Sequence, residues 1–260
     1  MPTSPDPGVA SIARIYDAYL DGEDHLPIDR ETAERVARRT PWAKPAARYN
    51  RAFMARAVED AVRAGIRQVV DIGCGMPTEP SSFSAARAAD PSAVVVGFDN
   101  DPAVLARAER MRDAGVRVLE GDIREPDRIV EALEPLIDWS RPVALVATAV
   151  LQFVPDELDP AGLLRVLSGR LSAGSRLVFT HSSTDGTAPE VVAGVEEVYG
   201  RGATAPITYR SDERIMEFLA GTRLLDPGLV AVQDWLGPDL PAPPDGPAVR
   251  LAAAVGVVPG

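Results

Sequence analysis

The residues with the clearest capacity for chemistry lie in a strand-and-turn pattern over residues 66–78, which read IRQVVDIGCGMPT. A short apolar run ends in Asp71, and Gly73, Gly75 and Thr78 follow it. Glycine lacks a Cβ atom, so the backbone can turn sharply here and approach a ligand closely. A helix beginning after the turn would direct its free N–H groups toward the same ligand. The pattern predicts a nucleotide-binding turn, and the alternative is an ordinary tight turn.

Polar residues also follow three later apolar runs, where predicted parallel strands end. Asp99 follows the second run, and a carboxylate there can accept both hydroxyl protons of a ribose. Asp122 follows the third run and can reach an exocyclic amine, while Ile123 can pack on a purine face. Each carboxylate taken singly could instead cap a helix or end a turn. Taken together, the strand ends predict a nucleoside site formed by Asp71, Gly73, Cys74, Gly75, Thr78, Asp99, Asn100, Gly121, Asp122, Ile123, Thr148, Ala149 and Val150.

The turn differs from turns that bind a pyrophosphate. A dinucleotide turn has a third glycine where this chain has Thr78, and the P-loop pattern is absent. No lysine or arginine occurs between Asp71 and Ser84, so phosphate neutralisation is not indicated. S-adenosylmethionine fits better, because it offers a ribose diol for Asp99, an adenine for the third strand end, and an ammonium and a carboxylate for the glycine turn. A nicotinamide-dependent reductase on the same architecture is a weaker alternative.

The elements that must position these residues alternate between strand and helix from residue 66 onward. The strand runs are continuously apolar, as buried parallel strands are. This alternation predicts an α/β, Rossmann-like fold with a mostly parallel seven-stranded sheet, helices on both faces and an antiparallel C-terminal edge. Strands are expected near 66–72, 93–98, 116–120, 142–149, 175–181, 229–235 and 249–257. Helices are expected near 79–89, 102–114, 125–136, 160–171, 189–199 and 211–220.

A mostly helical arm over residues 1–65 precedes the domain at 66–260. Apolar spacing predicts helices at 9–20 and 46–64, a charged helix at 29–39, and a loose start at 1–10. This arm should close over the substrate side of the site, where the ends of the fourth strand would supply the floor. The acidic stretch DGEDH at 21–25 has the wrong spacing for a good metal site, and no metal is expected. Candidates on the substrate side are Tyr16, Tyr19, Asp24, His25, Arg48, Asn50, Arg51, Gln152 and Phe153, although most such residues in proteins are core or surface residues.

Composition limits the classes of function. The chain has 260 residues and a formal net charge of −11, which disfavours nucleic acid as a partner. Cys74 is the single cysteine, so a disulfide within the chain or a cysteine zinc cluster is excluded. The sequence shows neither a signal peptide nor an apolar run long enough to span a membrane. A cytoplasmic protein with a small-molecule substrate is expected, and the oligomeric state is not predicted.

With these features the chain resembles the class I S-adenosylmethionine-dependent methyltransferases. More narrowly, it is similar to the actinobacterial S-adenosyl methyltransferase family, formerly a domain of unknown function. The resemblance implies the fold, S-adenosylmethionine as cofactor and S-adenosylhomocysteine as product, but it supplies no acceptor. This chain departs mildly from the family at Cys74, where Thr or Ser is common, and at Met76, where an aliphatic residue is common. The pieces that carry the resemblance are ARIYDAYLDGEDH, RYNRAFMARAV, DIGCGMPT, VGFDNDPAVLARA, GDIREP and LLDPGLVAVQDW.

The expected reaction is an in-line attack of a substrate nucleophile on the activated methyl group. The protein then has mainly to align and desolvate the reactants. A general base is needed only for a protonated nucleophile, and His181, at the end of the fifth strand, is the candidate. Such a histidine is more often a hydrogen-bonded wall of a pocket. Because no unambiguous base can be named, the alternative function is a catalytically silent S-adenosylmethionine-binding or regulatory protein.

Overall fold

The computed structural model describes residues 8–112, 115–238, 240 and 244–260. Two sequence predictions fall partly outside these ranges: the loose start at 1–10 and the end of the helix at 102–114. No helix within the described ranges is long and apolar enough to cross a membrane.

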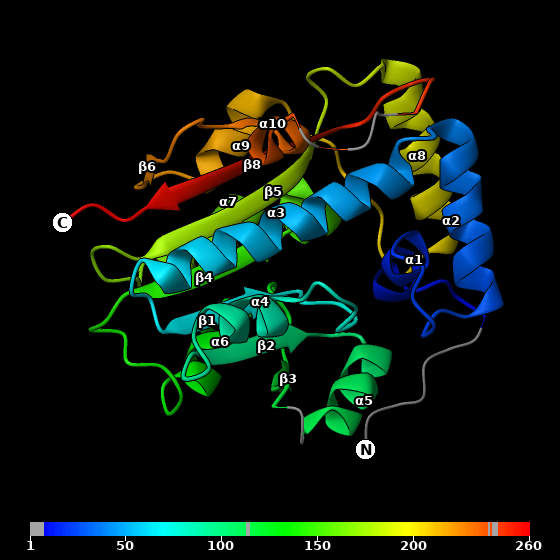
Figure 1. Cartoon of the computed structure of the whole chain (residues 1–260). Helices are drawn as coiled ribbons and strands as arrows, with labels where there is room; N and C mark the ends of the chain where they lie inside the picture. The colour runs from blue at the N-terminus through cyan, green and yellow to red at the C-terminus, as the bar shows by residue number, and fades with distance from the viewer. Residues whose placement is uncertain (1–7, 113–114, 239, 241–243) are drawn as a thin grey trace.

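The described strands form one eight-stranded sheet in the order β3-β2-β1-β4-β5-β8-β6, with β7 paired to β8 (Figure 1). Strands β1 to β5 are parallel, whereas β6 and β7 pair antiparallel with β8, which is itself antiparallel to β5. The predicted Rossmann-like fold with an antiparallel C-terminal edge is therefore confirmed. The strands are β1 (Gln68–Ile72), β2 (Val94–Asp99), β3 (Val118–Glu120), β4 (Val143–Thr148), β5 (Arg176–Ser183), β6 (Arg223–Leu224), β7 (Val230–Ala231) and β8 (Arg250–Val257).

The helices follow the predicted order, with shifts at their ends. The predicted helix at 46–64 begins earlier, at Ala43, because Pro45 lies in the first turn, where its missing N–H would have no partner in any case. The helices are α1 (Ile12–Tyr19), α2 (Pro27–Arg39), α3 (Ala43–Arg63), α4 (Ser82–Ala89), α5 (Pro102–Arg110), α6 (Pro126–Leu133), α7 (Pro160–Ser168), α8 (Pro189–Gly202), α9 (Asp212–Phe218) and α10 (Val232–Leu236).

The predicted strand at 229–235 is wrong over most of its length. Only Val230 and Ala231 pair with β8, and the next five residues form α10. The apolar run that begins this segment fits a strand, but tertiary packing decides otherwise. The helix brings the Trp235 ring to 5.3 Å from the ring centroid of Phe53 on α3. The segment still contributes one strand, β7, so the unpredicted β6 accounts for eight strands instead of the expected seven.

Two apolar layers cover the sheet because neighbouring residues of a strand point to opposite faces. Val69 packs in a core with α3, α4 and α10, whereas Val70 packs in a core with α6, α7 and α9. Helix α3, assigned to the arm from the sequence, is therefore also a cover of the sheet. A third core joins α1 and α2 to α8 at one end of the molecule (Figure 1).

The central pair of strands determines where a ligand can bind. The chain runs outward from β1 to β2 and β3, then returns to place β4 on the other side of β1. The crossovers diverge at the carboxyl ends of β1 and β4, where parallel α/β sheets leave a crevice. The third core lies over this edge, so the arm faces the crevice.

Candidate functional site

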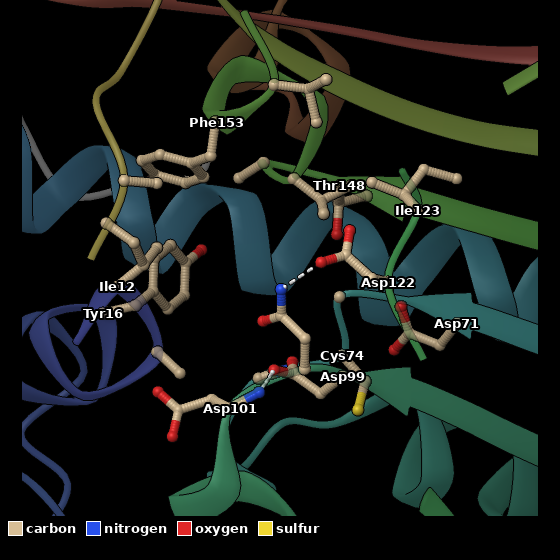
Figure 2. A pocket seen from close by; sticks show the side chains of 18 of the residues that line it. Ile12, Tyr16, Asp71, Cys74, Asp99, Asp101, Asp122, Ile123, Thr148 and Phe153 are labelled. Atoms are coloured by element: carbon tan, nitrogen blue, oxygen red, sulfur yellow. Dashed lines mark hydrogen bonds between the residues drawn. The ribbon is translucent and has the colours of Figure 1, made fainter. Parts of the chain in front are cut away.

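A cavity lies at the carboxyl ends of β1 to β4 (Figure 2). Its wall combines four strand ends with α1, with α3 and with the segment after α8. The residues that line it are Ile12, Ala13, Tyr16, Asn50, Arg51, Met54, Asp71, Gly73, Cys74, Gly75, Asp99, Asn100, Asp101, Asp122, Ile123, Arg124, Thr148, Ala149, Val150, Phe153, Val154, Thr204 and Ala205.

Eleven of the thirteen residues predicted for the nucleoside site line this cavity. They are Asp71, Gly73, Cys74, Gly75, Asp99, Asn100, Asp122, Ile123, Thr148, Ala149 and Val150. The other two lie outside the lining. The Thr78 hydroxyl donates to Asp17 Oδ1 at 2.7 Å, and Gly121 packs so closely that an added Cβ would lie 2.6 Å from the Phe98 ring.

The glycine turn after β1 has the predicted geometry. Gly73 and Gly75 have φ angles of 65° and 66°, which favour glycine. A Cβ on Gly73 would lie 2.4 Å from a methyl carbon of Val150, so this glycine also lets the end of β4 approach. The N–H of Gly75 donates to Asp99 Oδ2 at 2.8 Å. The turn and the second strand end are thus joined directly.

Asp99 is the best-organised carboxylate of the cavity. It is 7% exposed, and its Oδ1 accepts a second backbone hydrogen bond, from Asp101 N at 2.9 Å. Burial raises its pKa to about 6, against the lowering effect of the two backbone donors. Each oxygen keeps a further lone pair, so the side chain is held in place and can still accept hydroxyl protons.

The carboxylates at the other strand ends differ in environment. Asp71 is buried and accepts from the Ser82 hydroxyl at 2.6 Å, and burial raises its pKa to about 6. Burial also acts to raise the pKa of Asp122, but hydrogen bonds from Arg124 and Asn100 outweigh it, and the pKa lies below the usual value. At neutral pH both side chains are therefore predominantly ionised.

A hydrogen-bonded chain ties the arm to the floor of the cavity. Asn50 Nδ2 donates to the Tyr16 hydroxyl at 2.7 Å, and Asn50 Oδ1 accepts from the Thr180 hydroxyl at 2.7 Å. Thr180 Oγ1 in turn accepts from Ala149 N at 2.9 Å. The Tyr16 hydroxyl itself donates to Ala47 O at 3.0 Å, so the side chains of Tyr16 and Asn50 are both fixed.

Arg51 is the one basic residue of α3 that reaches the cavity in the described structure. It is 7% exposed, donates to Met76 O at 3.0 Å and lies 5.5 Å from the centroid of the Tyr16 ring. Among the described residues, no carboxylate lies within 4.0 Å of its guanidinium nitrogens. A buried cation without such a partner is costly, and it suits an anionic ligand group beside the glycine turn.

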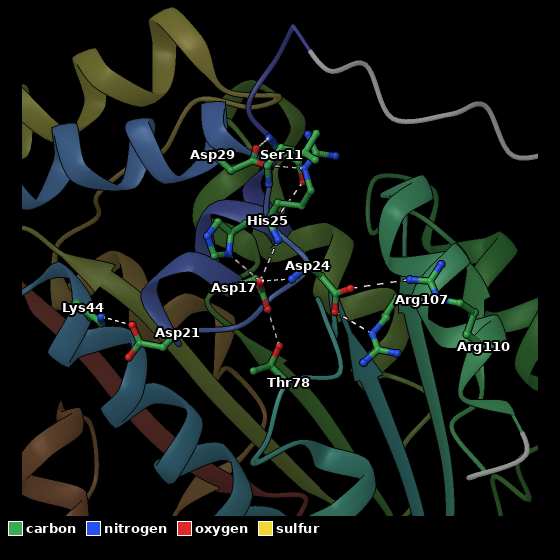
Figure 3. Close-up of polar contacts among 12 residues, drawn as sticks. Ser11, Asp17, Asp21, Asp24, His25, Asp29, Lys44, Thr78, Arg107 and Arg110 are labelled. Carbon is green, nitrogen blue, oxygen red and sulfur yellow. Dashed lines mark hydrogen bonds and ion pairs between the residues drawn. The ribbon is translucent and has the colours of Figure 1, made fainter.

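The other substrate-side candidates of the arm do not line the cavity. Tyr19 is buried in the third core, and Arg48 pairs with Asp21 on the surface. His25 Nδ1 lies 3.2 Å from Asp17 Oδ2, and Asp24 accepts from Arg107 Nε at 2.8 Å (Figure 3). These partners explain the DGEDH stretch as a connection between the arm, the glycine turn and α5. Within the described ranges, no group of three or more His, Cys, Asp or Glu side chains could hold a metal.

His181 and Gln152 also lie outside the cavity lining. His181 is 0% exposed, and burial lowers its pKa to about 3. Its Nε2 accepts from Arg210 Nη1 at 2.7 Å, so its Nδ1 carries the proton and donates to Ser182 O at 2.8 Å. Gln152 Oε1 accepts from the amide and the hydroxyl of Ser182, both at 3.0 Å. This placement gives no support to His181 as the catalytic base.

Arg210 holds the segment that connects β4 to α7. It is 4% exposed and donates to Leu151 O at 3.1 Å, to Val154 O at 2.7 Å and to Asp156 Oδ1 at 2.8 Å, as well as to His181. Of the two carbonyls that it binds, one belongs to Val154, which lines the cavity, and the other to Leu151, which follows Val150 of the lining. Arg210 therefore positions this part of the cavity wall, although it does not line the cavity.

Replacement of Arg210 by Met is expected to lower the free energy of unfolding by about 3 kcal/mol, because several buried acceptors lose their donor at once. Urea unfolding followed by circular dichroism measures this change. Arg214→Met is the control, because Arg214 is exposed and its pair with Glu217 is worth about 0.5 kcal/mol or less. Equal losses in the two variants would show that Arg210 does not hold the segment.

Eight lining residues escaped the sequence analysis. Asp101 is the one that the sequence could have supplied, since it stands beside Asp99 in GFDND. The sequence around Thr204 and Ala205 carries no such signal. These residues reach the cavity because α8 packs on the arm, where the Thr204 N–H donates to Ala10 O at 2.9 Å. The eight are Ile12, Ala13, Met54, Asp101, Arg124, Val154, Thr204 and Ala205.

Comparisons with known proteins identify the family. The family model described as S-adenosyl methyltransferase matches residues 2–259. A crystal structure of a DUF574 family protein from Streptomyces avermitilis is 35% identical, with a TM-score of 0.89 over 98% of this chain and 99% of that chain. A putative methyltransferase from Thermobifida fusca is 28% identical, with a TM-score of 0.87 over 97% of this chain and 96% of that one.

More distant similarity is limited to the fold. Human N-acetylserotonin methyltransferase, solved in complex with S-adenosylmethionine, is 15% identical, with a TM-score of 0.51 over 95% of this chain and 66% of that chain. No curated protein sequence matches this chain significantly. The whole-chain match confirms the resemblance seen in the sequence, and the chain belongs to the S-adenosyl methyltransferase family as an S-adenosylmethionine-dependent methyltransferase.

Proposed function

We propose that this enzyme transfers the methyl group of S-adenosylmethionine to a small-molecule acceptor bound in the cavity under the arm. The observation that carries the proposal is a single cavity that joins the glycine turn and Asp99 to residues of α1. Enzymes with a parallel α/β sheet bind cofactors and small ligands in concave sites of this kind, at the carboxyl ends of the strands. The residues of the arm would act as a lid that excludes water from the reacting groups.

The residues present fit the cofactor. Asp99 would accept the ribose hydroxyls, and Asp122 and Ile123 would hold the adenine. Arg51 would bind the carboxylate of the methionine moiety, and Asp71 would favour its ammonium through a hydrogen bond or a water. When bound, the cofactor supplies a methyl group already activated by the sulfonium charge. The protein contributes position, enclosure and charge.

Two measurements test the proposal. Isothermal titration calorimetry of the purified protein with S-adenosylhomocysteine should give saturable binding of one molecule per chain. A screen of small molecules with methyl-labelled S-adenosylmethionine should then give at least one labelled product. Failure to bind either form of the cofactor would defeat the proposal.

A silent cofactor-binding protein is the second candidate, favoured by the position of His181 away from the cavity. The same screen separates the two candidates. Turnover with any acceptor would exclude a silent protein, whereas binding of the cofactor without turnover across a broad screen would favour it.

Cofactor binding should weaken in mild acid. Burial raises the pKa of Asp99 to about 6 in the free protein, so its carboxyl is increasingly neutral below that pH. Ribose hydroxyls donate to the ionised form, so binding favours loss of this proton, and affinity rises with pH up to about 6 and then levels off. Between pH 7 and pH 5 the affinity for S-adenosylhomocysteine should fall about tenfold for one such group.

Calorimetry across this range measures the effect. Asp71 has a pKa raised to about 6 as well, so the Asp71→Asn variant separates the two carboxylates. If the wild type and Asp71→Asn both show the fall, Asp99 is the group responsible. A flat profile in the wild type would contradict the assignment of Asp99 to the ribose.

A further inference from the structure

Charge is distributed unevenly over the cavity. The charged residues of its described lining lie at the ends of β1, β2 and β3 and on the adjoining part of α3. This half is where the cofactor groups fit, and its two other charged residues have protein partners: Arg124 pairs with Asp122, and Asp101 accepts from Ala103 N at the start of α5. The charged residues of this half are Arg51, Asp71, Asp99, Asp101, Asp122 and Arg124.

The half under the arm has a different character, and we call it the acceptor half. Its described lining comprises Ile12, Ala13, Tyr16, Phe153, Val154, Thr204 and Ala205, and none of these side chains is charged. The Thr204 hydroxyl already accepts from Ile12 N at 3.3 Å. Arg51 borders this half beneath the Tyr16 ring, but the cofactor carboxylate would neutralise it. A carboxylate or phosphate on an acceptor would thus find no cation to pair with in the described lining of this half.

Two aromatic rings face the acceptor half, and both are held in place (Figure 2). The Phe153 ring lies 5.8 Å from the Tyr199 ring centroid at an angle of 42°. The Tyr16 hydroxyl is fixed by Asn50 and by Ala47 O. Rings that are already ordered lose little entropy when a flat ligand packs against them.

We propose, on the basis of the methyl-transfer function above, that the acceptor is a planar aromatic compound that reacts through a hydroxyl or thiol and carries no other charge. Among the described residues of the acceptor half, none titrates near neutral pH, and burial raises the pKa of Tyr16 further. The acceptor therefore loses its proton to water before transfer. The oxygen or sulfur of the acceptor then bonds to the methyl carbon. The bond between that carbon and the cofactor sulfur breaks, and its electron pair remains on the cofactor sulfur. An anion and a cation become two neutral products, which an apolar compartment favours.

Three bicyclic probes test the class of acceptor, each titrated into the protein saturated with S-adenosylhomocysteine. 2-Naphthol is planar and otherwise uncharged, 6-hydroxy-2-naphthoate adds a carboxylate, and decahydro-2-naphthol removes the aromatic plane. 2-Naphthol should bind about tenfold more tightly than the naphthoate and about fivefold more tightly than the saturated alcohol. Equal or tighter binding of either comparison compound would overturn the inference, as would a lack of 2-naphthol binding.

Variants locate the binding surface. Phe153→Ala should weaken the binding of 2-naphthol about tenfold, and Phe153→Leu should weaken it less. The affinity of both variants for S-adenosylhomocysteine should stay within about twofold of the wild type. Leu158→Ala is the matched control, because Leu158 is 45% exposed and does not line this cavity. Loss of 2-naphthol binding in the control alone, or no loss in Phe153→Ala, would contradict the proposal. Failure of the protein to bind S-adenosylhomocysteine would instead count against the methyl-transfer function itself.

Discussion

Replacement of Arg51 by Met is expected to weaken the binding of S-adenosylhomocysteine about 100-fold, with little change in the binding of 5′-methylthioadenosine. The two ligands share the nucleoside and the sulfur, but only the first carries the amino-acid carboxylate. Arg51 is buried beside the glycine turn and has no carboxylate partner within 4.0 Å among the described residues. Removing one member of a buried charge pair typically costs about 2–5 kcal/mol, which corresponds to a loss of this size.

The control for this experiment lies one helical turn away. Arg48 is on α3 as well, but its side chain is 53% exposed, pairs with Asp21 and lies outside the cavity lining. Arg48→Met should leave the affinity for both ligands unchanged. A parallel loss of both ligands in Arg51→Met would mean that Arg51 supports the shape of the site and does not bind the carboxylate. Unchanged binding of both would remove Arg51 from the cofactor site.

Replacement of Asp99 by Ala should give a different pattern: the binding of S-adenosylhomocysteine and the binding of 5′-methylthioadenosine should both weaken about 100-fold. The ribose is common to both, and two hydrogen bonds to a carboxylate are worth about 3 kcal/mol together. The backbone N–H groups of Gly75 and Asp101 hold the Asp99 carboxylate, so its oxygens are already oriented in the protein without ligand. Calorimetry with the two ligands distinguishes this variant from Arg51→Met directly.

Glu120 provides the matched control for Asp99. It is also an acidic residue at a strand end, but it is exposed and does not line the cavity. Glu120→Ala should bind both ligands like the wild type. Because Asp99 accepts from the Gly75 amide, thermal unfolding of Asp99→Ala without ligand should be recorded alongside. If the folded Asp99→Ala protein still binds both ligands tightly, the assignment of Asp99 to the ribose is contradicted.

Sequence reasoning could bring the strand-end residues together in one cavity because parallel strands place their carboxyl ends at one edge. Asp71, Asp99 and Asp122 are far apart in the chain, yet each follows an apolar run, and local pattern places all three at that edge. The same kind of prediction failed at 229–235, where an apolar run indicated a strand. There the packing of Trp235 against Phe53 favours a helix, and no local signal reports that contact.

His181 and Arg51 show the other limit of local pattern. Both are polar residues near predicted element ends, and the sequence gives no means of ranking them. His181 points into the layer beside Phe179 and Phe218, where Arg210 fixes it. Arg51 lies on the side of a long helix that happens to face the glycine turn. Which side of an element meets a ligand depends on how the elements pack.

The sequence by itself determined the fold, the strand-end carboxylates and the glycine turn, because these follow from the period of apolar residues and from the backbone needs of a tight turn. Only the tertiary structure decided which residues of the arm enter the cavity, that Thr204 and Ala205 join them, and that His181 does not. The physical reason is that the acceptor half is built from segments that meet only when α1 and α8 pack across the edge of the sheet. Such contacts between distant segments leave no periodic trace in any one of them.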